Sequence, residues 1–289
     1  MTTQNIQTMR DLKILARDET KGFQWPTLAL SVFLIFMTLM GSWLAATGII
    51  PLWLAMISNS FWIAQGYTVA HECAHRNLHG HHQKFRWLND VFGIASFFFT
   101  LHSYTVHCHV HRLHHAHTND RTRDTDAWVS DAPNLPMGIF RSLAFYFHTN
   151  FFVFKIFHLV HDKKRFVIRA AIETAIPVGA ALVLAAIGYW REVLMLWALP
   201  TIFSFAIVSF AIDWIPHHVE DKSDEIKATM IIKPPETLGG KVFSALYNNH
   251  NYHLVHHLVP SVPWYAQKRI FDKAELLLNQ SGARITKLN

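Results

Sequence analysis

The sequence predicts an all-α integral membrane protein, with four transmembrane helices in two hairpins, interfacial helices and a cytoplasmic cap rich in histidine. Three observations lead to this fold class. Hydrophobic residues make up 51% of the 289 residues and charged residues only 16%, the apolar residues gather in two long runs, and 21 histidines gather in short clusters around those runs. Soluble proteins carry about 25% charged residues, so we expect much of this chain, a single domain over 1–289, to face lipid.

The first apolar run is long enough to cross a membrane twice. From Gly22 to Ala70 it contains no Asp, Glu, Lys or Arg over 49 residues, and one spanning helix needs about 20 residues. Gly48 and Pro51 interrupt a helix. We therefore expect two helices, at about 25–46 and 51–71, with a tight turn between them.

The second apolar run predicts another hairpin. One crossing is expected at about 166–190 and the next at about 193–215, with the charged pair Arg191-Glu192 in the turn between them. Two shorter apolar or aromatic stretches, 88–106 and 138–160, lie close to histidines or contain them. We expect both stretches to form helices that lie in the membrane interface.

Basic residues indicate the orientation. With four crossings, every Lys and Arg except Arg191 lies on the side of the termini, and basic loops collect on the cytoplasmic face. Both termini are therefore expected in the cytoplasm. The formal net charge of +6 would make this face attractive to anionic lipid or to an acidic protein. Nucleic acid is not an expected partner, because no compact basic motif is present.

Histidines form three boxes with helical spacing: HxxxH at 71–75, and HxxHH at both 111–115 and 253–257. Residues three and four apart lie on one face of a helix, so each box can direct its imidazoles to one point. All three boxes, and a further histidine after the last crossing, are expected on the same side of the membrane. One of the pair His217-His218 could add a ninth candidate metal ligand to the eight box histidines, which are His71, His75, His111, His114, His115, His253, His256 and His257.

Eight or nine imidazoles exceed what one metal ion can hold. Two ions are therefore expected, each with four or five ligands. Imidazole suits zinc, copper, iron and nickel. Redox chemistry on a hydrocarbon favours iron, because zinc does not change its oxidation state.

The first box also permits a different interpretation. His71-Glu72-Cys73-Ala74-His75 spells HExxH, the pattern in which two histidines bind zinc and the glutamate is the general base of a metalloprotease. An intramembrane zinc protease would leave the boxes at 111–115 and 253–257 unexplained. A metal store or transporter would need polar residues within the crossings, and these crossings contain almost none.

The order and spacing of the boxes, together with four crossings, resemble the membrane fatty acid desaturase superfamily, which includes acyl desaturases, hydroxylases and carotenoid-ring oxygenases. The stretches HHAHTNDRTRDTDAW (114–128) and NYHLVHHLVPSVPWY (251–265) are most similar to bacterial carotene hydroxylases and related proteins. The short HxxxH box, where many acyl desaturases have HxxxxH, also favours this branch.

The resemblance implies a non-haem centre of two iron ions bound by nine histidines, with dioxygen as co-substrate. Eight of them are the box histidines, and the ninth is His217, which matches an extra family histidine just after the last crossing. It implies oxidation of an unactivated C–H bond in a lipid, either an acyl chain or a carotenoid such as β-carotene, to an alkene or an alcohol. No His-Pro-Gly-Gly haem segment is present, so a separate electron donor, a ferredoxin or a small cytochrome, is expected on the basic cytoplasmic face. The expected location is a bacterial inner membrane.

Four more residues are expected next to the ligands. Glu72 would orient a ligand imidazole. Asp213 lies four residues before His217, where the resemblance implies an asparagine beside metal-bound water. His79 and His250 flank the first and third boxes.

Overall fold

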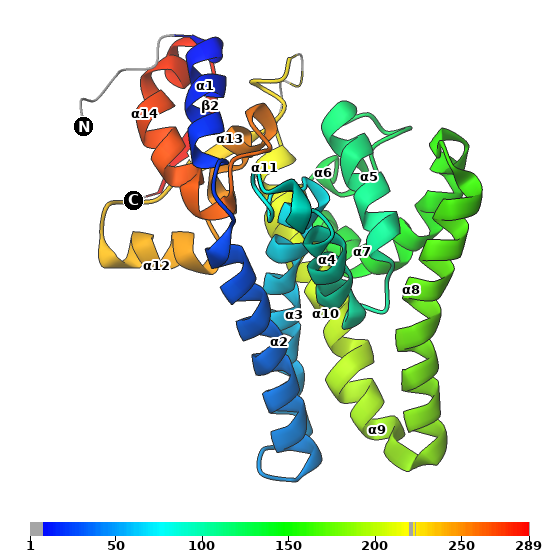
Figure 1. The fold of residues 1–289 in the computed structure, drawn as a ribbon. Coiled ribbons are helices and arrows are strands. Elements are labelled where there is room, and N and C mark those ends of the chain that lie inside the picture. The colour runs from blue at the N-terminus through cyan, green and yellow to red at the C-terminus, as the bar shows by residue number, and fades with distance from the viewer. Residues whose placement is uncertain (1–7, 220–221, 223, 289) are drawn as a thin grey trace.

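Figure 1 shows a helical stem below a mixed cap, in the computed structural model that describes residues 8–219, 222 and 224–288. The helices are α1 (Met9–Glu19), α2 (Trp25–Ala46), α3 (Leu52–Ala74), α4 (Leu88–Phe98), α5 (Tyr104–Ala116), α6 (Ala127–Ser130), α7 (Leu135–Ile156), α8 (Lys163–Leu184), α9 (Trp190–Val193), α10 (Leu199–Val208), α11 (Ile215–His217), α12 (Leu238–Leu246), α13 (His253–Leu258) and α14 (Gln267–Gln280), and the strands are β1 (Met230–Lys233) and β2 (Arg284–Lys287).

The first predicted hairpin is present. Helix α2 ends where the sequence predicts, Gly48 takes a positive φ of 76° in the turn, and Pro51 caps the start of α3. Helix α3 then packs against α2, α4 and α10 and continues to Ala74. It therefore carries the first histidine box to the border between stem and cap.

The second hairpin is one continuous helical stretch that folds back at Gly188, whose φ is 108°. Two helical stretches of the described chain are long and apolar enough to cross a membrane, Trp25–Ala46 and the 55-residue stretch Lys163–His217 that contains this whole hairpin. Helix α3 is long but contains the buried polar residues Asn59 and Thr68, which lower its hydropathy. The four separate crossings therefore remain a prediction.

The helix expected over 88–106 is wrong in its length. Leu101 has a φ of 51°, and the chain turns between α4 and α5. The Ser103 side chain then accepts a hydrogen bond from the backbone N–H of Val106 and starts α5 as a new helix. The reason is local: a side-chain oxygen before the first turn satisfies an otherwise unpaired N–H. The break gives the second histidine box a helix of its own.

The prediction of an all-α protein is also wrong in the cap, where β1 and β2 form a parallel pair with Ile231 opposite Ile285. Each strand has only four residues, and about fifty residues separate them, so no alternating pattern marks them as partners. Ile231 is fully buried in a core that also contains Leu254 and Phe271. This core joins α1, α13 and α14 and gives the third histidine box a rigid support.

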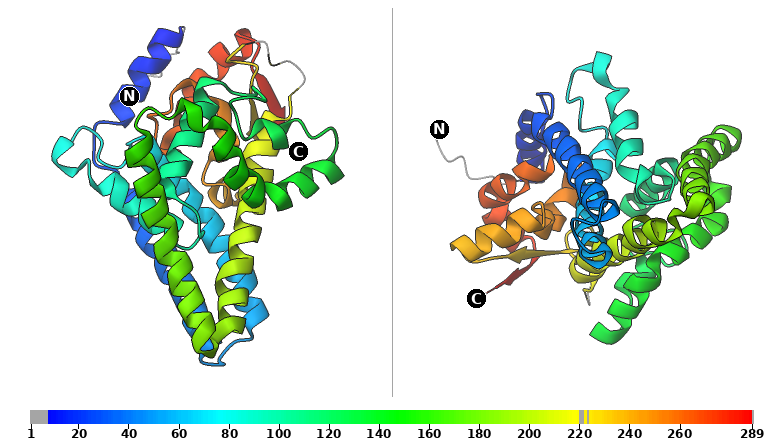
Figure 2. Two further views of the ribbon diagram at one scale, coloured as in Figure 1. Left: turned by 90° about the vertical axis from the view of Figure 1, so that its right-hand side faces the viewer. Right: turned by 90° about the horizontal axis from the view of Figure 1, so that it is seen from below.

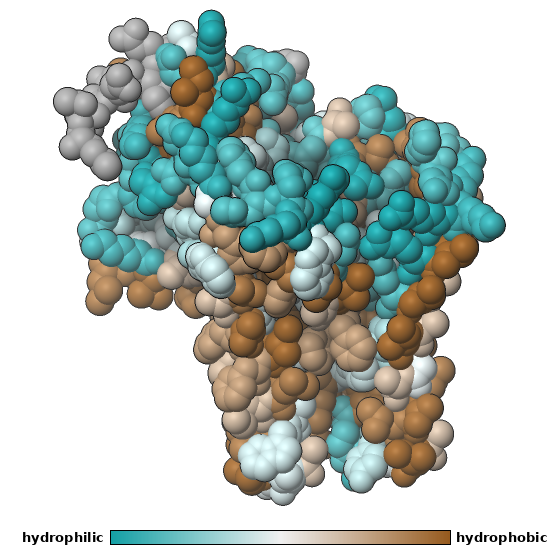
Figure 3. All heavy atoms as spheres, viewed as in Figure 1, coloured by the Kyte–Doolittle hydropathy of each residue, from teal (hydrophilic) through white to brown (hydrophobic). Residues whose placement is uncertain are grey.

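The surface divides into two zones. Figure 3 shows a brown, apolar stem below a teal, polar cap. Figure 2 shows that α2 with α3 and α8 with α10 all run along the long direction of the stem, and that both hairpin turns lie at the end away from the termini. The histidine boxes lie where the two zones meet.

Candidate metal centre

Four separate segments bring the histidine boxes together. The first box lies at the carboxyl end of α3, the second on α5 and the third on α13. His217 is the last residue of α11, just after a widened helical segment at Ser209–Trp214. Widened turns of this kind are frequent at functional sites. The segments lie far apart in sequence, so the fold and not the local chain builds the site.

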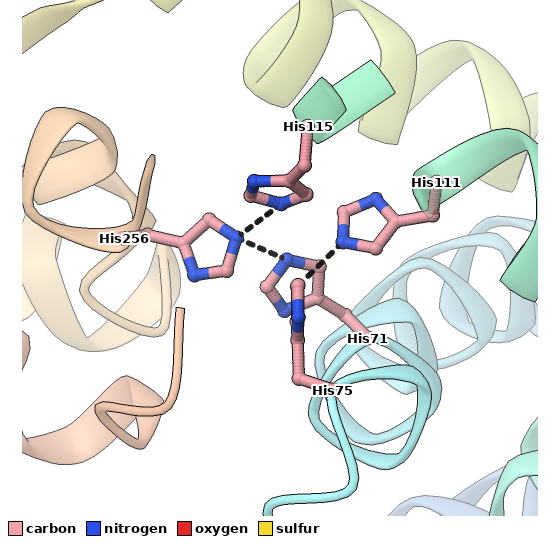
Figure 4. A group of neighbouring side chains, drawn as sticks. All are labelled: His71, His75, His111, His115 and His256. Carbon is pink, nitrogen blue, oxygen red and sulfur yellow. Dashed lines mark hydrogen bonds between the residues drawn. The ribbon is translucent and has the colours of Figure 1, made fainter. Parts of the chain in front are cut away.

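One group contains five histidines, drawn in Figure 4: His71, His75, His111, His115 and His256. Their Nε2 atoms converge. The Nε2 atoms of His71 and His256 are 3.0 Å apart, those of His75 and His111 2.7 Å, and those of His256 and His115 2.9 Å. Each box contributes to this group.

A second group contains four buried histidines: His114, His217, His253 and His257. The Nε2 atom of His253 is 2.9 Å from that of His217 and 3.2 Å from that of His257, and His114 approaches His257 to 3.2 Å. The two groups are neighbours, because the ring centres of His115 and His257 are 4.6 Å apart.

The geometry fits metal ions. Metal–nitrogen bonds of about 2.1 Å put neighbouring ligands at right angles about 3 Å apart, and the Nε2 separations match that spacing. Burial, reinforced by neighbouring histidines, lowers the pKa of His111, His115, His256 and His257 well below the usual value and that of His75 to about 3. These imidazoles are therefore neutral, which is the form that binds metal.

His114 differs from the other candidates because two carboxylates face it. Its Nδ1–H donates to Asp124 at 3.0 Å, and Asp126 lies 3.3 Å away. Burial opposes the charged imidazole, but the two carboxylates outweigh it and raise the pKa to about 9. A carboxylate on Nδ1 fixes the tautomer and leaves Nε2 for a metal. We did not predict Asp124 or Asp126 as site residues, although both lie within the stretch 114–128 quoted above.

All nine candidate ligands lie in these two groups, but the four expected neighbours behave differently. Glu72 accepts hydrogen bonds from the Asn77 side chain and the Trp264 backbone N–H, both at 3.1 Å, and not from a histidine. It therefore joins the first box to the loop after the third box. Glu72 is also turned away from the general-base role of the protease interpretation, which no feature of the site supports.

The other three expected neighbours take separate positions. His250 lies beside His71, with ring centres 5.2 Å apart, and its Nε2 is 3.1 Å from the Thr68 hydroxyl. His79 pairs with Asn89 of α4 through Nδ1 at 3.0 Å. Asp213 is buried and lines a cavity together with His111.

That cavity borders the five-histidine group at His111 and extends into the stem. Its walls come from α3, α4, α5, α7 and α10, and most of its surface is apolar. The apolar lining includes Ile63, Ala64, Phe97, Val110, Phe145 and Phe205. His107, which stacks on His111 with ring centres 5.4 Å apart, and Tyr67 also face it. A hydrocarbon placed here would lie against a candidate metal ligand.

Comparison with known families identifies this arrangement. Residues 41–289 match the family model described as fatty acid desaturase. The chain belongs to the fatty acid desaturase family. Members of this family generally bind two iron ions through histidines, and the assignment places this desaturase homologue among the membrane di-iron oxidoreductases.

Three individual curated relatives share only 21–26% sequence identity with this chain. The desaturase homologue is 26% identical over 277 residues to an sn-1 oleoyl-lipid 12-desaturase of Anabaena variabilis, covering 83% of this chain and 73% of the relative. It is 23% identical over 254 residues to a Delta(9) fatty acid conjugase-like enzyme of Dimorphotheca sinuata, covering 71% of this chain and 64% of the relative. It is 21% identical over 265 residues to a fatty acid conjugase of Calendula officinalis, covering 76% of this chain and 68% of the relative. The chain thus spans about two thirds of the length of these relatives.

Proposed function

We propose that this protein desaturates the acyl chain of a membrane lipid, with dioxygen as co-substrate and two iron ions held by the nine histidines. The observation that carries this proposal is that groups of five and four imidazoles lie side by side and that His111 of the first group lines a largely apolar cavity. The names of the relatives, a 12-desaturase and conjugases, favour an acyl chain over a carotenoid ring and desaturation over hydroxylation.

The proposal places four helices across the bilayer. Helix α3 runs beside α2, and the stretch that contains α8 and α10 forms the second hairpin (Figure 2). Exposed aromatic and aliphatic side chains on the stem support contact with lipid tails: Phe36 of α2 is 53% exposed and Leu182 of α8 is 65% exposed. In this arrangement the cap and both termini face the cytoplasm.

Iron held here and reduced by the electron donor would activate dioxygen to remove two hydrogens from unactivated C–H bonds; these hydrogens, two donor electrons and two protons would convert the dioxygen to water. The chain's own residues do the rest. The apolar cavity walls position the hydrocarbon and exclude water, the box histidines hold the metal through Nε2, and Asp124 holds the His114 Nδ1–H. Positioning of this kind decides whether one or two hydrogens come within reach.

The electron donor is proposed to be a separate acidic protein, a ferredoxin or small cytochrome, that docks on the cap. The two groups differ in exposure: His75 and His115 of the five-histidine group are half-buried, whereas all members of the four-histidine group are buried. Arg112, next to His111 on α5, is exposed. We therefore place electron entry at the five-histidine group, where charge complementarity would steer an acidic donor.

The test is expression in two bacterial hosts, one with only saturated and monounsaturated lipids and one that also makes β-carotene. Mass spectrometry of the extracted lipids is compared with that from a His256→Ala variant. Acyl chains that have lost two hydrogen atoms, only in the aerated wild-type culture, support desaturation. Acyl chains that have gained one oxygen atom would show that the enzyme hydroxylates the chain, and would overturn desaturation. Modified carotene with unchanged acyl chains would overturn the choice of substrate.

A further inference from the structure

Helix α12 presents an apolar face that no other part of the described chain covers. Leu238, Val242 and Leu246 stand four residues apart and are 79%, 49% and 56% exposed. Residues at this spacing lie on one face of a helix. Three large aliphatic side chains in a row on a polar cap form an exposed apolar patch, and such patches mark surfaces that bind a protein or a membrane.

The opposite face of α12 fixes its orientation. Gly240 and Ser244 are buried, and a side chain at Gly240 would collide with the carbonyl oxygen of Pro235. Phe243 packs against the cluster that contains Met230 of β1. Because the inner face is closely packed, α12 cannot rotate about its axis to bury Leu238, Val242 and Leu246.

The position of α12 shows what its outer face meets. In Figure 1 the helix projects sideways from the cap, across the direction of α2 and α3. In Figure 3 the side of this region nearest the stem is brown and the side above it is teal, and the brown side lies at the level where the apolar stem begins. The apolar patch of α12 therefore lies at the same level as the upper end of the apolar surface of the stem.

We propose that α12 lies in the membrane interface, with its leucine face in the boundary between headgroups and acyl chains. An amphipathic helix that runs across the spanning helices can bury its apolar face to that depth while its polar face stays in water. This inference rests on the insertion of the stem in a bilayer, as proposed above. The occupant is the lipid surface of the same membrane.

The contacts at the end of α12 give this position a consequence for the site. The Gln65 side chain of α3 donates to the carbonyl of Leu246 at 2.8 Å, and the Tyr247 hydroxyl donates to the carbonyl of Ala211 at 2.6 Å. Asn248 and Asn249 then take positive φ values of 48° and 56°, and the third box follows at His253. The helix in the interface would thus help to fix the distance of the third box from the headgroups on the cytoplasmic side.

Three leucines with similar exposure allow a matched test. Leu246 of α12 is 56% exposed, Leu39 of the stem helix α2 is 53% exposed, and Leu276 of α14 in the cap is 57% exposed. Each is changed to cysteine in a background in which Cys73 and Cys108 are alanine, and is labelled with an environment-sensitive fluorophore. The protein is placed in phosphatidylcholine nanodiscs and exposed to nitroxide lipids, shallow or deep, or to aqueous iodide.

We expect the shallow nitroxide to quench the label at 246 several-fold more strongly than iodide does. The label at 39 should respond to the deep nitroxide, and the label at 276 only to iodide. A label at 246 that responds to iodide as strongly as the label at 276 would place α12 in water, and one shielded from every quencher would place it against a protein; either result overturns the inference. Failure of lipid to quench at 39 would instead overturn insertion of the stem. Val242→Cys repeats the test if the variant at 246 does not fold.

Discussion

His71 and His256 are separated by 185 residues, yet their Nε2 atoms lie 3.0 Å apart. One belongs to the end of α3 in the stem and the other to α13 in the cap. The contact therefore joins the two halves of the molecule directly at the candidate metal centre. His256 also approaches His115 of α5, so removal of this one imidazole affects the contribution of every box.

Replacement of His256 by alanine should lower bound iron and abolish lipid oxidation. With the five-histidine group reduced to four members, we expect the iron content to fall from about two ions per chain towards one. Elemental analysis of protein purified with iron measures this. His158→Ala is the control, because His158 is exposed, lies in neither histidine group, and bonds to the Lys155 carbonyl. Equal iron and equal product in both variants would contradict the assignment.

Asp124→Asn should weaken iron binding without removing a ligand. The asparagine amide cannot accept from the His114 Nδ1–H and from two backbone N–H groups as the carboxylate does. Loss of such a partner typically costs about 10–100-fold in metal affinity. Competition with a chelator measures the affinity for iron. Asp120→Asn is the control, because Asp120 lies in the same turn but accepts a hydrogen bond from the exposed Arg123 side chain. An unchanged affinity in the Asp124 variant would show that His114 does not need the carboxylate.

The difference between His114 and Asp124 shows how far the sequence alone could lead. Helical spacing within each box predicted the eight box histidines, because the geometry of a helix is fixed by residue number, whereas His217 came only from the family resemblance. The contact between His114 and Asp124 depends on the turn formed by residues 117–126, and spacing says nothing about the path of a turn. The division into five and four histidines also depends on how α5 is placed against α13.

The stem and the cap differ in the same way. The apolar runs predicted α2, α3 and the second hairpin, since long runs with few charges have few alternative structures. The interface helix α12 has nine residues and two adjacent glycines, and the strands have four residues each, so their local signals are weak. Tertiary packing on Ile231 and Phe243 decides these elements.

Glu72→Gln should reduce stability more than it reduces chemistry. The Glu72 carboxylate accepts hydrogen bonds from both the Asn77 side chain and the Trp264 backbone N–H. A glutamine side chain has only one oxygen, so its NH2 group would have to point at one of these two N–H donors. An unsatisfied buried pair costs about 1–3 kcal/mol. We expect a lower melting temperature with iron and part of the lipid product retained. Complete loss of product with normal iron and normal melting would mean that Glu72 acts in the reaction.

Removal of iron should destabilise the cap relative to the stem. A ligand at 100 times its dissociation constant stabilises the folded state by about 2.7 kcal/mol, and the histidine groups join α3, α5, α11 and α13. Thermal unfolding with and without an iron chelator measures the shift. The His256→Ala variant should show a smaller shift than the wild type, because it has less iron to lose. The same shift in both would indicate that the chelator acts elsewhere.

Gly93→Ala should destabilise the protein, whereas Gly179→Ala should stabilise it. A Cβ on Gly93 of α4 would lie 2.7 Å from Cε1 of Tyr104 and closer to Cζ, and Tyr104 is buried at the start of α5. Overpacking of this kind costs about 1–3 kcal/mol, which exceeds the gain of about 0.5–1 kcal/mol from alanine in a helix. Nothing lies within 4 Å of a Cβ at Gly179 of α8, so only the gain remains there. Thermal unfolding in detergent measures both. Because Tyr104 begins the helix that carries the second box, Gly93→Ala should also lower the amount of bound iron. If both substitutions stabilised the protein, α4 would be able to move away from α5 at little cost in free energy.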